Sequence, residues 1–142
     1  MTGNEPKIVD SNILIYAYDS AEGKKHEKAI KAVEEILLSG NGVLSIQNLV
    51  EFYSVITQKV SKPVSQENAK QIVLDLCEGF EIIKYNEKTI IEATNIGMAH
   101  KVPFWDALLA ATMQENKVYT IITENEGHFK KISWIKTINP LK

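Results

Sequence analysis

The stretch KIVDSNILIYAYD, residues 7–19, decides the fold of this chain. Ile8 and Val9 are typical of a short buried strand, and an apolar run resumes at Ile13. Asp10 stands between these two apolar elements. In parallel α/β sheets, ligands bind outside the carboxyl ends of the strands. The stretch therefore predicts a buried strand that ends at a functional acid, although an aspartate here is also a good N-cap for the following helix.

The rest of the chain alternates short apolar strands with helices. Strands are expected over 7–10, 43–45, 80–83 and 119–123, with a fifth over 135–137. Helices are expected over about 12–18, 23–39, 47–60, 66–78, 87–100 and 103–116. This alternation favours a parallel sheet that is covered on both faces. We therefore predict a three-layer α/β/α fold with a central parallel sheet of four to five short strands, in a single domain over 1–142.

The composition excludes several classes of protein. No apolar run approaches the roughly 18 residues of a membrane span, and the N-terminal MTGNEPK lacks a signal-peptide core, so we expect a cytoplasmic protein with no membrane segment. Cys77 is the only cysteine, which excludes an intrachain disulfide and a thiolate metal cage. All 16 basic residues are lysine and the net charge is -2, so binding of nucleic acid by charge alone is not expected.

Two further acids stand in apolar helices. Glu51 shares one helix face with Gln47, Ser54 and Gln58, and that polar stripe faces either water or a cleft. Asp106 lies among aromatic and aliphatic residues and has no polar stripe around it. An acid in the first turn of a helix complements the helix dipole, but an exposed glutamate would do that equally well. We therefore favour a functional role for Asp106.

The order of these acids along the chain predicts one site. Asp10 ends the first strand, Glu51 follows the second strand, and Asp106 opens the helix before the fourth strand, so the three are expected to meet at one edge of the sheet. Three carboxylates without an arginine repel one another. A hard divalent cation resolves that repulsion, since oxygen ligands suit Mg²⁺ or Mn²⁺.

The segment after the fourth strand, TENEGHF at 123–129, is also polar. Thr123 and Asn125 are possible helix caps, and Glu124 is either a fourth acid or an ordinary first-turn acid. His128 has no serine or cysteine motif near it that would suggest nucleophilic catalysis. We therefore assign no function to this histidine, nor to the other two in the chain.

Four segments in this order resemble the PIN-domain ribonucleases, in particular the VapC-like toxins of bacterial and archaeal toxin–antitoxin pairs. The segments are IVDSNILIYAYD, SIQNLVEFYSVI, PFWDALLAA and TENEGHF. The resemblance implies metal-dependent hydrolysis of RNA that leaves a 3′-hydroxyl and a 5′-phosphate. It also implies a homodimer and a small antitoxin protein, an extended segment of which lies over the active-site groove.

The resemblance also implies roles for individual residues. It places metal ligation on Asp10, Glu51 and Asp106, and polar support on Asn12 and Thr123. The sequence departs from the family pattern at Asn125, which stands where many family members have a fourth acid. An amide adds no negative charge, which weakens the case for a second metal ion. Three aromatic residues are candidates to line the groove, or else belong to the core: Tyr16, Phe52 and Trp105.

Two other phosphate-handling folds fit poorly. A haloacid-dehalogenase-type phosphatase needs a second acid two residues after the first, where this chain has Asn12, and a response-regulator receiver needs an aspartate at the end of the third strand. One alternative stays open. It is a PIN-like scaffold that binds RNA or protein without cleavage, which Asn125 favours and the three acids oppose.

Overall fold

Five short parallel strands form the centre of the molecule. The structure is a computed structural model, and it describes residues 5–142. The strands are β1 Lys7–Val9, β2 Gly42–Ser45, β3 Glu81–Ile83, β4 Thr120–Ile122 and β5 Lys136–Ile138. They lie in the order β3-β2-β1-β4-β5, and every neighbouring pair is parallel. The predicted parallel sheet is confirmed, with a fifth strand that begins one residue later than expected.

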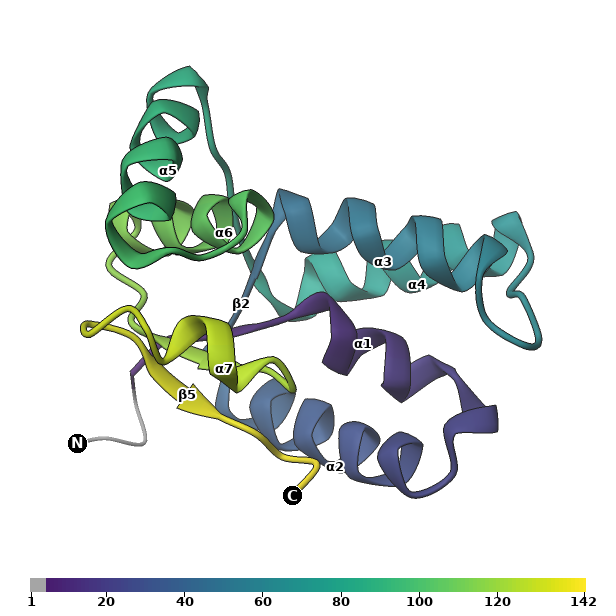
Figure 1. Ribbon diagram of the computed structural model, residues 1–142. Coiled ribbons are helices and arrows are strands. Elements are labelled where there is room, and N and C mark those ends of the chain that lie inside the picture. Colours follow the sequence, from purple (N-terminus) through teal and green to yellow (C-terminus); the bar gives the residue numbers. More distant parts are fainter. Residues whose placement is uncertain (1–4) are drawn as a thin grey trace.

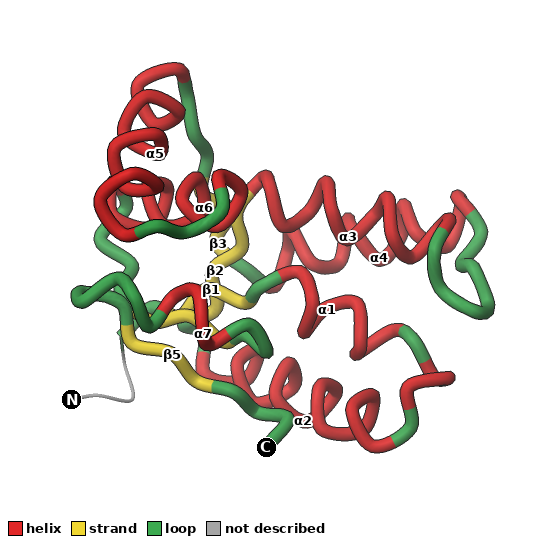
Figure 2. Tube along the Cα trace, viewed as in Figure 1, coloured by secondary structure: helices red, strands yellow, loops and turns green. Residues whose placement is uncertain are grey.

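Helices connect the strands and form the outer layers (Figures 1 and 2). They are α1 Ser11–Tyr18, α2 Lys24–Ser39, α3 Ile46–Gln58, α4 Gln66–Gly79, α5 Glu87–His100, α6 Phe104–Glu115 and the short α7 Glu126–Phe129. The predicted helix boundaries lie within two residues of the observed ones, and two of the shifts have a local reason. The helix predicted over 23–39 begins at Lys24, because Gly23 has a positive φ of 57° after a 3₁₀ turn over Ser20–Glu22. Pro103 is the N-cap of α6 rather than its first residue.

The core is divided by the sheet into two parts. Ile8 packs into a cluster with residues of α5 and α6, whereas Val9 packs with residues of α1 to α4. This division follows from strand geometry, since successive side chains point to opposite faces. Figure 2 shows the consequence, with α5 and α6 on one side of the strands and α1 to α4 on the other. The predicted three-layer architecture is therefore confirmed.

The strand order creates a switch point between β1 and β4. From β1 the chain proceeds outward to β2 and β3, whereas β4 and β5 add on the other side of β1. In such sheets the helices on either side of the switch point diverge and leave a crevice at the carboxyl ends of the strands. Asp10 and Thr123 immediately follow β1 and β4 at this point.

In the described part of the chain, no helix combines the length and the apolar character that crossing a membrane requires. Residues 1–4, which form part of the segment predicted to lack a signal-peptide core, lie outside the described range.

Candidate active site

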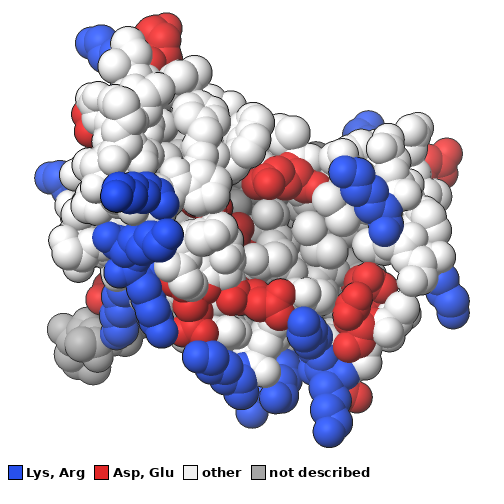
Figure 3. All heavy atoms as spheres, in the orientation of Figure 1, with Lys and Arg blue, Asp and Glu red and all other residues white. Residues whose placement is uncertain are grey.

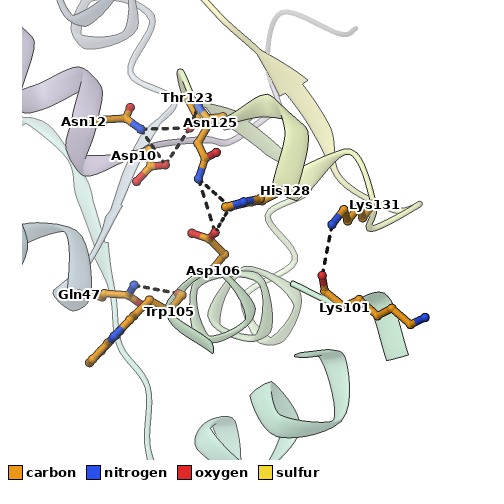
Figure 4. Close-up of polar contacts among 10 residues, drawn as sticks. All are labelled: Asp10, Asn12, Gln47, Lys101, Trp105, Asp106, Thr123, Asn125, His128 and Lys131. Carbon is orange, nitrogen blue, oxygen red and sulfur yellow. Dashed lines mark hydrogen bonds and ion pairs between the residues drawn. The ribbon is translucent and has the colours of Figure 1, made fainter. Parts of the chain in front are cut away.

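Asp10 lies at the switch point and is almost completely buried. Its Oδ1 accepts a hydrogen bond of 2.8 Å from the backbone N–H of Ser11, so Asp10 is the N-cap of α1. Its Oδ2 accepts a hydrogen bond of 2.8 Å from Thr123 Oγ1 and a longer one of 3.4 Å from Asn12 Nδ2. The same carboxylate therefore caps a helix and is fixed from the neighbouring strand (Figure 4).

Glu51 reaches the same place from α3. The start of α3 is fixed by a capping box, in which Ser45 Oγ accepts from the N–H of Asn48 and the Asn48 side chain accepts from the N–H of Ser45. This cap fixes the start of α3 directly after β2. Ser11 Oγ lies 3.4 Å from Asp10 Oδ1 and also 3.4 Å from Glu51 Oε1. The two acids therefore lie on either side of one hydroxyl group.

Gln47 connects α3 to α6. Its side chain is buried, and its Nε2 donates a hydrogen bond of 2.9 Å to the carbonyl oxygen of Trp105. Its Oε1 is buried and has no hydrogen-bond partner among the described residues. The polar stripe predicted on α3 thus divides in two, since Gln47 and Glu51 face inward whereas Ser54 and Gln58 are exposed.

Asp106 lies in the first turn of α6, immediately after the anchored Trp105 carbonyl. Its Oδ2 is 2.5 Å from His128 Nδ1 and 3.5 Å from Asn125 Nδ2 (Figure 4). A carboxylate oxygen can only accept, so His128 Nδ1 carries the proton in this contact. Among the described residues, Oδ1 of Asp106 makes no hydrogen bond, which leaves that oxygen available to a ligand.

His128 is the site residue that sequence reasoning missed. The sequence offers it no serine or cysteine motif, but in the structure its partner is an acid 22 residues earlier in the chain. The one signal in the sequence was its place in the polar segment that follows β4. The contact with Asp106 requires α7 to pack against α6, and no local sequence pattern predicts that packing.

Burial and mutual repulsion act on two of the acids. Burial raises the pKa of Asp10 above its ordinary value, and the negative charge of Asp106 raises it further. Hydrogen bonds from Thr123 and Ser11 act in the opposite direction without cancelling the shift. Burial also raises the pKa of Glu51, with a further contribution from the charge of Asp10. Raised carboxylate pKa values without a cationic partner are characteristic of a functional site.

Glu124 is not a fourth member of this cluster. Its carboxylate is 2.8 Å from Lys25 Nζ and accepts a hydrogen bond of 2.7 Å from the hydroxyl of Tyr16. Partial burial raises the pKa of Glu124, but these two partners outweigh it and the net shift is downward. Glu126 is likewise engaged elsewhere, with Lys142 and Asn139, which lower its pKa to about 2. Neither glutamate joins the three acids beside Asn125.

The donor set can be tested against a divalent cation. Within residues 5–142, no three His, Cys, Asp or Glu side chains lie close enough to form a ready-made metal-binding group. Mg²⁺, however, keeps several waters and is usually held by one or two carboxylates together with substrate phosphates. No lysine in the described range forms an ion pair with Asp10, Glu51 or Asp106. These oxygen donors, which no lysine of the described range neutralises, therefore suit a partly hydrated hard cation.

The three aromatic groove candidates lie in different environments. Phe52 is completely buried in the core, and Tyr16 lies at the rim with its hydroxyl on Glu124. Trp105 is 61% exposed, so the alternative that it belongs to the core is wrong. In Figure 3, acidic side chains gather in and below the hollow of this face, whereas lysines lie around its margin.

The chain belongs to the PIN-domain family, whose model matches residues 7–135. No curated protein sequence matches the chain.

Among solved structures, the chain is similar to FitAB bound to an IR36 DNA fragment, with 19% identity, a TM-score of 0.74 and coverage of 96% of each chain. It is also similar to a toxin–antitoxin complex from Klebsiella pneumoniae, with 20% identity, a TM-score of 0.69 and coverage of 94% of this chain and 97% of the other. The VapC20 toxin of Mycobacterium tuberculosis, described as cleaving the sarcin–ricin loop, has 12% identity, a TM-score of 0.67 and coverage of 92% and 97%.

Proposed function

We propose that this protein is a divalent-metal-dependent endoribonuclease and the toxin of a toxin–antitoxin pair. One observation carries the proposal. Asp10 and Glu51 lie on either side of the Ser11 hydroxyl at the switch point, and Asp106 lies close enough to raise the pKa values of both. A structural role alone does not explain this arrangement, because the raised pKa values of Asp10 and Glu51 mean that their negative charges oppose folding.

Asp10, Glu51 and Asp106 are the residues that would hold Mg²⁺ or Mn²⁺. Such a cation supplies ionisation of water at neutral pH and neutralisation of charge on the scissile phosphate. Thr123 and Asn12 orient Asp10 through their hydrogen bonds to its Oδ2. Asn125 and His128 contact Oδ2 of Asp106, so Oδ1 is the oxygen that would be left to the cation.

RNA is the substrate that we favour. The support is the similarity in fold to VapC20, which is described as a toxin that cleaves the sarcin–ricin loop. The chain has no arginine, so its lysines would contact the RNA backbone as point charges rather than as bidentate forks. We infer that the protein acts in the cytoplasm, where such RNA is found.

A small antitoxin protein is the partner that we propose. Several structural neighbours were solved as toxin–antitoxin complexes. An open apolar groove of about 860 Å³ between α3 and α4 is the surface that we propose for this partner, and its lining includes Leu49, Val50, Tyr53 and Leu74.

We also propose a homodimer, because Ile91 and Met98, on one face of α5, are 62% and 72% exposed.

The proposal is tested by incubation of the purified protein with a structured RNA in Mg²⁺, in Mn²⁺ and in chelator. We expect endonucleolytic cuts with either metal and none in chelator. The open alternative, a PIN-like scaffold that binds without cleavage, predicts an RNA mobility shift with intact RNA in all three conditions. Intact and unbound RNA throughout would exclude both readings.

A further inference from the structure

A small pocket lies beside Glu51. Its volume is about 330 Å³, and its lining comprises Gln47, Val50, Glu51, Tyr85 and Trp105. Three elements supply this lining: the start of α3, the start of α6 and the segment after β3. Its volume lies at the lower end of the range for small-molecule sites, which begins at about 300 Å³.

The pocket presents two aromatic side chains to solvent. Trp105 is 61% exposed and Tyr85 is 37% exposed. The hydrogen bond from Gln47 fixes the backbone of Trp105, and the indole ring points away from Asp106 (Figure 4). Adjacent residues of a helix point about 100° apart, so one turn of α6 directs Asp106 at the acid cluster and Trp105 at the pocket. An indole ring with a fixed backbone and an exposed face is suited to stacking. Contact with water is unfavourable for the apolar face, and a flat ligand that covers the face removes this contact.

The polar groups of the pocket are mainly acceptors. The carboxylate of Glu51 lies in its wall, and Gln47 Oε1 is buried without a hydrogen-bond partner among the described residues. Gln47 Oε1 has no contact with solvent, so a ligand in the pocket would meet Glu51 instead, and one that brings an N–H group to this acid would be favoured. Flat, aromatic-stacking ligands with exocyclic amino groups combine both properties, and nucleobases are of this kind.

We propose that this pocket binds one unpaired base of the RNA next to the cleaved bond, by stacking on Trp105. The proposal rests on the proposed ribonuclease function. It adds that a base next to the cleaved bond is bound by the protein and thereby positions the phosphate of that bond. An unpaired base is required, since a base within a duplex cannot expose its face to a side chain. Adenine, cytosine and guanine fit the acceptor lining better than uracil, which has no amino group.

The central test combines a protein variant with a modified RNA. We would take a single-stranded oligoribonucleotide that the wild type cleaves in Mn²⁺ and remove the base at each position around the cut. One abasic position is expected to raise KM about tenfold for the wild type, since stacking of one base on an aromatic side chain is worth about that factor. Trp105→Ala is expected to raise KM similarly with the intact RNA and to show no further loss at that abasic position. Trp105→Phe should restore most of the affinity.

Controls separate a local effect from damage to the fold. Tyr119→Ala removes an aromatic side chain of similar exposure, 46%, outside the pocket, and should leave KM unchanged. The Mn²⁺-induced rise in melting temperature should be equal in the wild type and in Trp105→Ala, because the acid cluster is intact. In Trp134→Phe, Trp105 is the only tryptophan, and RNA should quench its fluorescence in chelator, where no cleavage occurs.

The outcomes are distinguishable. If the wild type cleaves RNA but Trp105→Ala keeps both its KM and its sensitivity to the abasic position, the base pocket is wrong and the ribonuclease function stands. That same result is expected if the pocket instead receives a segment of a protein partner. If no RNA is bound or cleaved with any metal, the proposed function fails and the base pocket fails with it.

Discussion

Thr123 Oγ1 donates a hydrogen bond of 2.8 Å to Asp10 Oδ2, although 113 residues separate the two in the sequence. The same hydroxyl oxygen accepts from the backbone N–H of Asn125 at 2.9 Å. One threonine therefore joins the carboxyl ends of β1 and β4 and fixes the loop that carries Asn125. This connection places the first acid of the chain beside the last polar segment, at the point where the sheet reverses its order.

Asp10→Asn and Asp106→Asn should each abolish metal-dependent RNA cleavage. Loss of a metal ligand removes several kcal/mol of transition-state stabilisation, so the rate should fall on the order of a thousandfold or more. Initial rates in Mn²⁺ check this, with circular dichroism to show that both variants are folded. Cleavage near the wild-type rate in either variant would refute the assignment of these acids.

Without metal, Asp10→Asn should melt at or above the temperature of the wild type at pH 7. The pKa values of Asp10 and Glu51 are raised in the folded state, so the folded protein takes up protons first as pH falls. Their ionisation therefore destabilises the fold above their folded pKa values, and that effect is relieved at lower pH. Thermal melts in chelator should show the difference between variant and wild type narrowing as the pH falls below 7.

Mn²⁺ should raise the melting temperature of the wild type much more than that of Asp10→Asn, because only the wild type keeps all three acids for preferential binding to the folded state. If Asp10 were only a helix cap, both proteins would respond equally to the metal.

Asn125→Asp should tighten Mn²⁺ binding about tenfold, since one more negative charge a few ångströms from a cation contributes roughly 1–4 kcal/mol. Glu124→Gln is the matched comparison. It removes a charge from the adjacent residue, but that charge is already paired with Lys25, so Mn²⁺ affinity should stay unchanged. Isothermal titration calorimetry measures both. A weaker affinity in Glu124→Gln would show that Glu124 turns toward the metal.

His128→Ala should weaken Mn²⁺ binding by about 10- to 100-fold, as is typical when a hydrogen-bond partner of a metal ligand is removed. The reason is that Asp106 Oδ2 loses its donor at 2.5 Å and keeps only the longer contact of 3.5 Å with Asn125 Nδ2, which orients the carboxylate less firmly. His128→Gln should recover part of the affinity, because the amide can still donate. His100→Ala, which removes a ring bonded only to a backbone oxygen, serves as the control. An increase in affinity in His128→Ala would mean that the histidine competes with the metal.

Local patterns in the sequence were enough for the layers and for the candidate acids. The alternation of short apolar strands with helices predicted the parallel sheet, because strand and helix periods are properties of neighbouring residues. Asp10 was identifiable for the same reason, since a carboxylate between two apolar elements stands out within a few positions. The order of Asp10, Glu51 and Asp106 then indicated one sheet edge, because parallel strands bring their carboxyl ends together.

The partners of those acids were decided only by the tertiary structure. Gln47 bonds the Trp105 carbonyl, which is 58 residues further along the chain. His128 contacts Asp106, which is 22 residues earlier. Helix and strand periods concern neighbouring residues and do not predict contacts at such sequence separations. The sequence left open whether Glu124 is a fourth acid of the site. In the fold its carboxylate contacts Lys25 and Tyr16 instead of the other acids. Hydrogen bonds between side chains depend on where whole helices lie. Helix packing sets that position, so the sequence by itself determined where the acids stand and the fold decided what each of them faces.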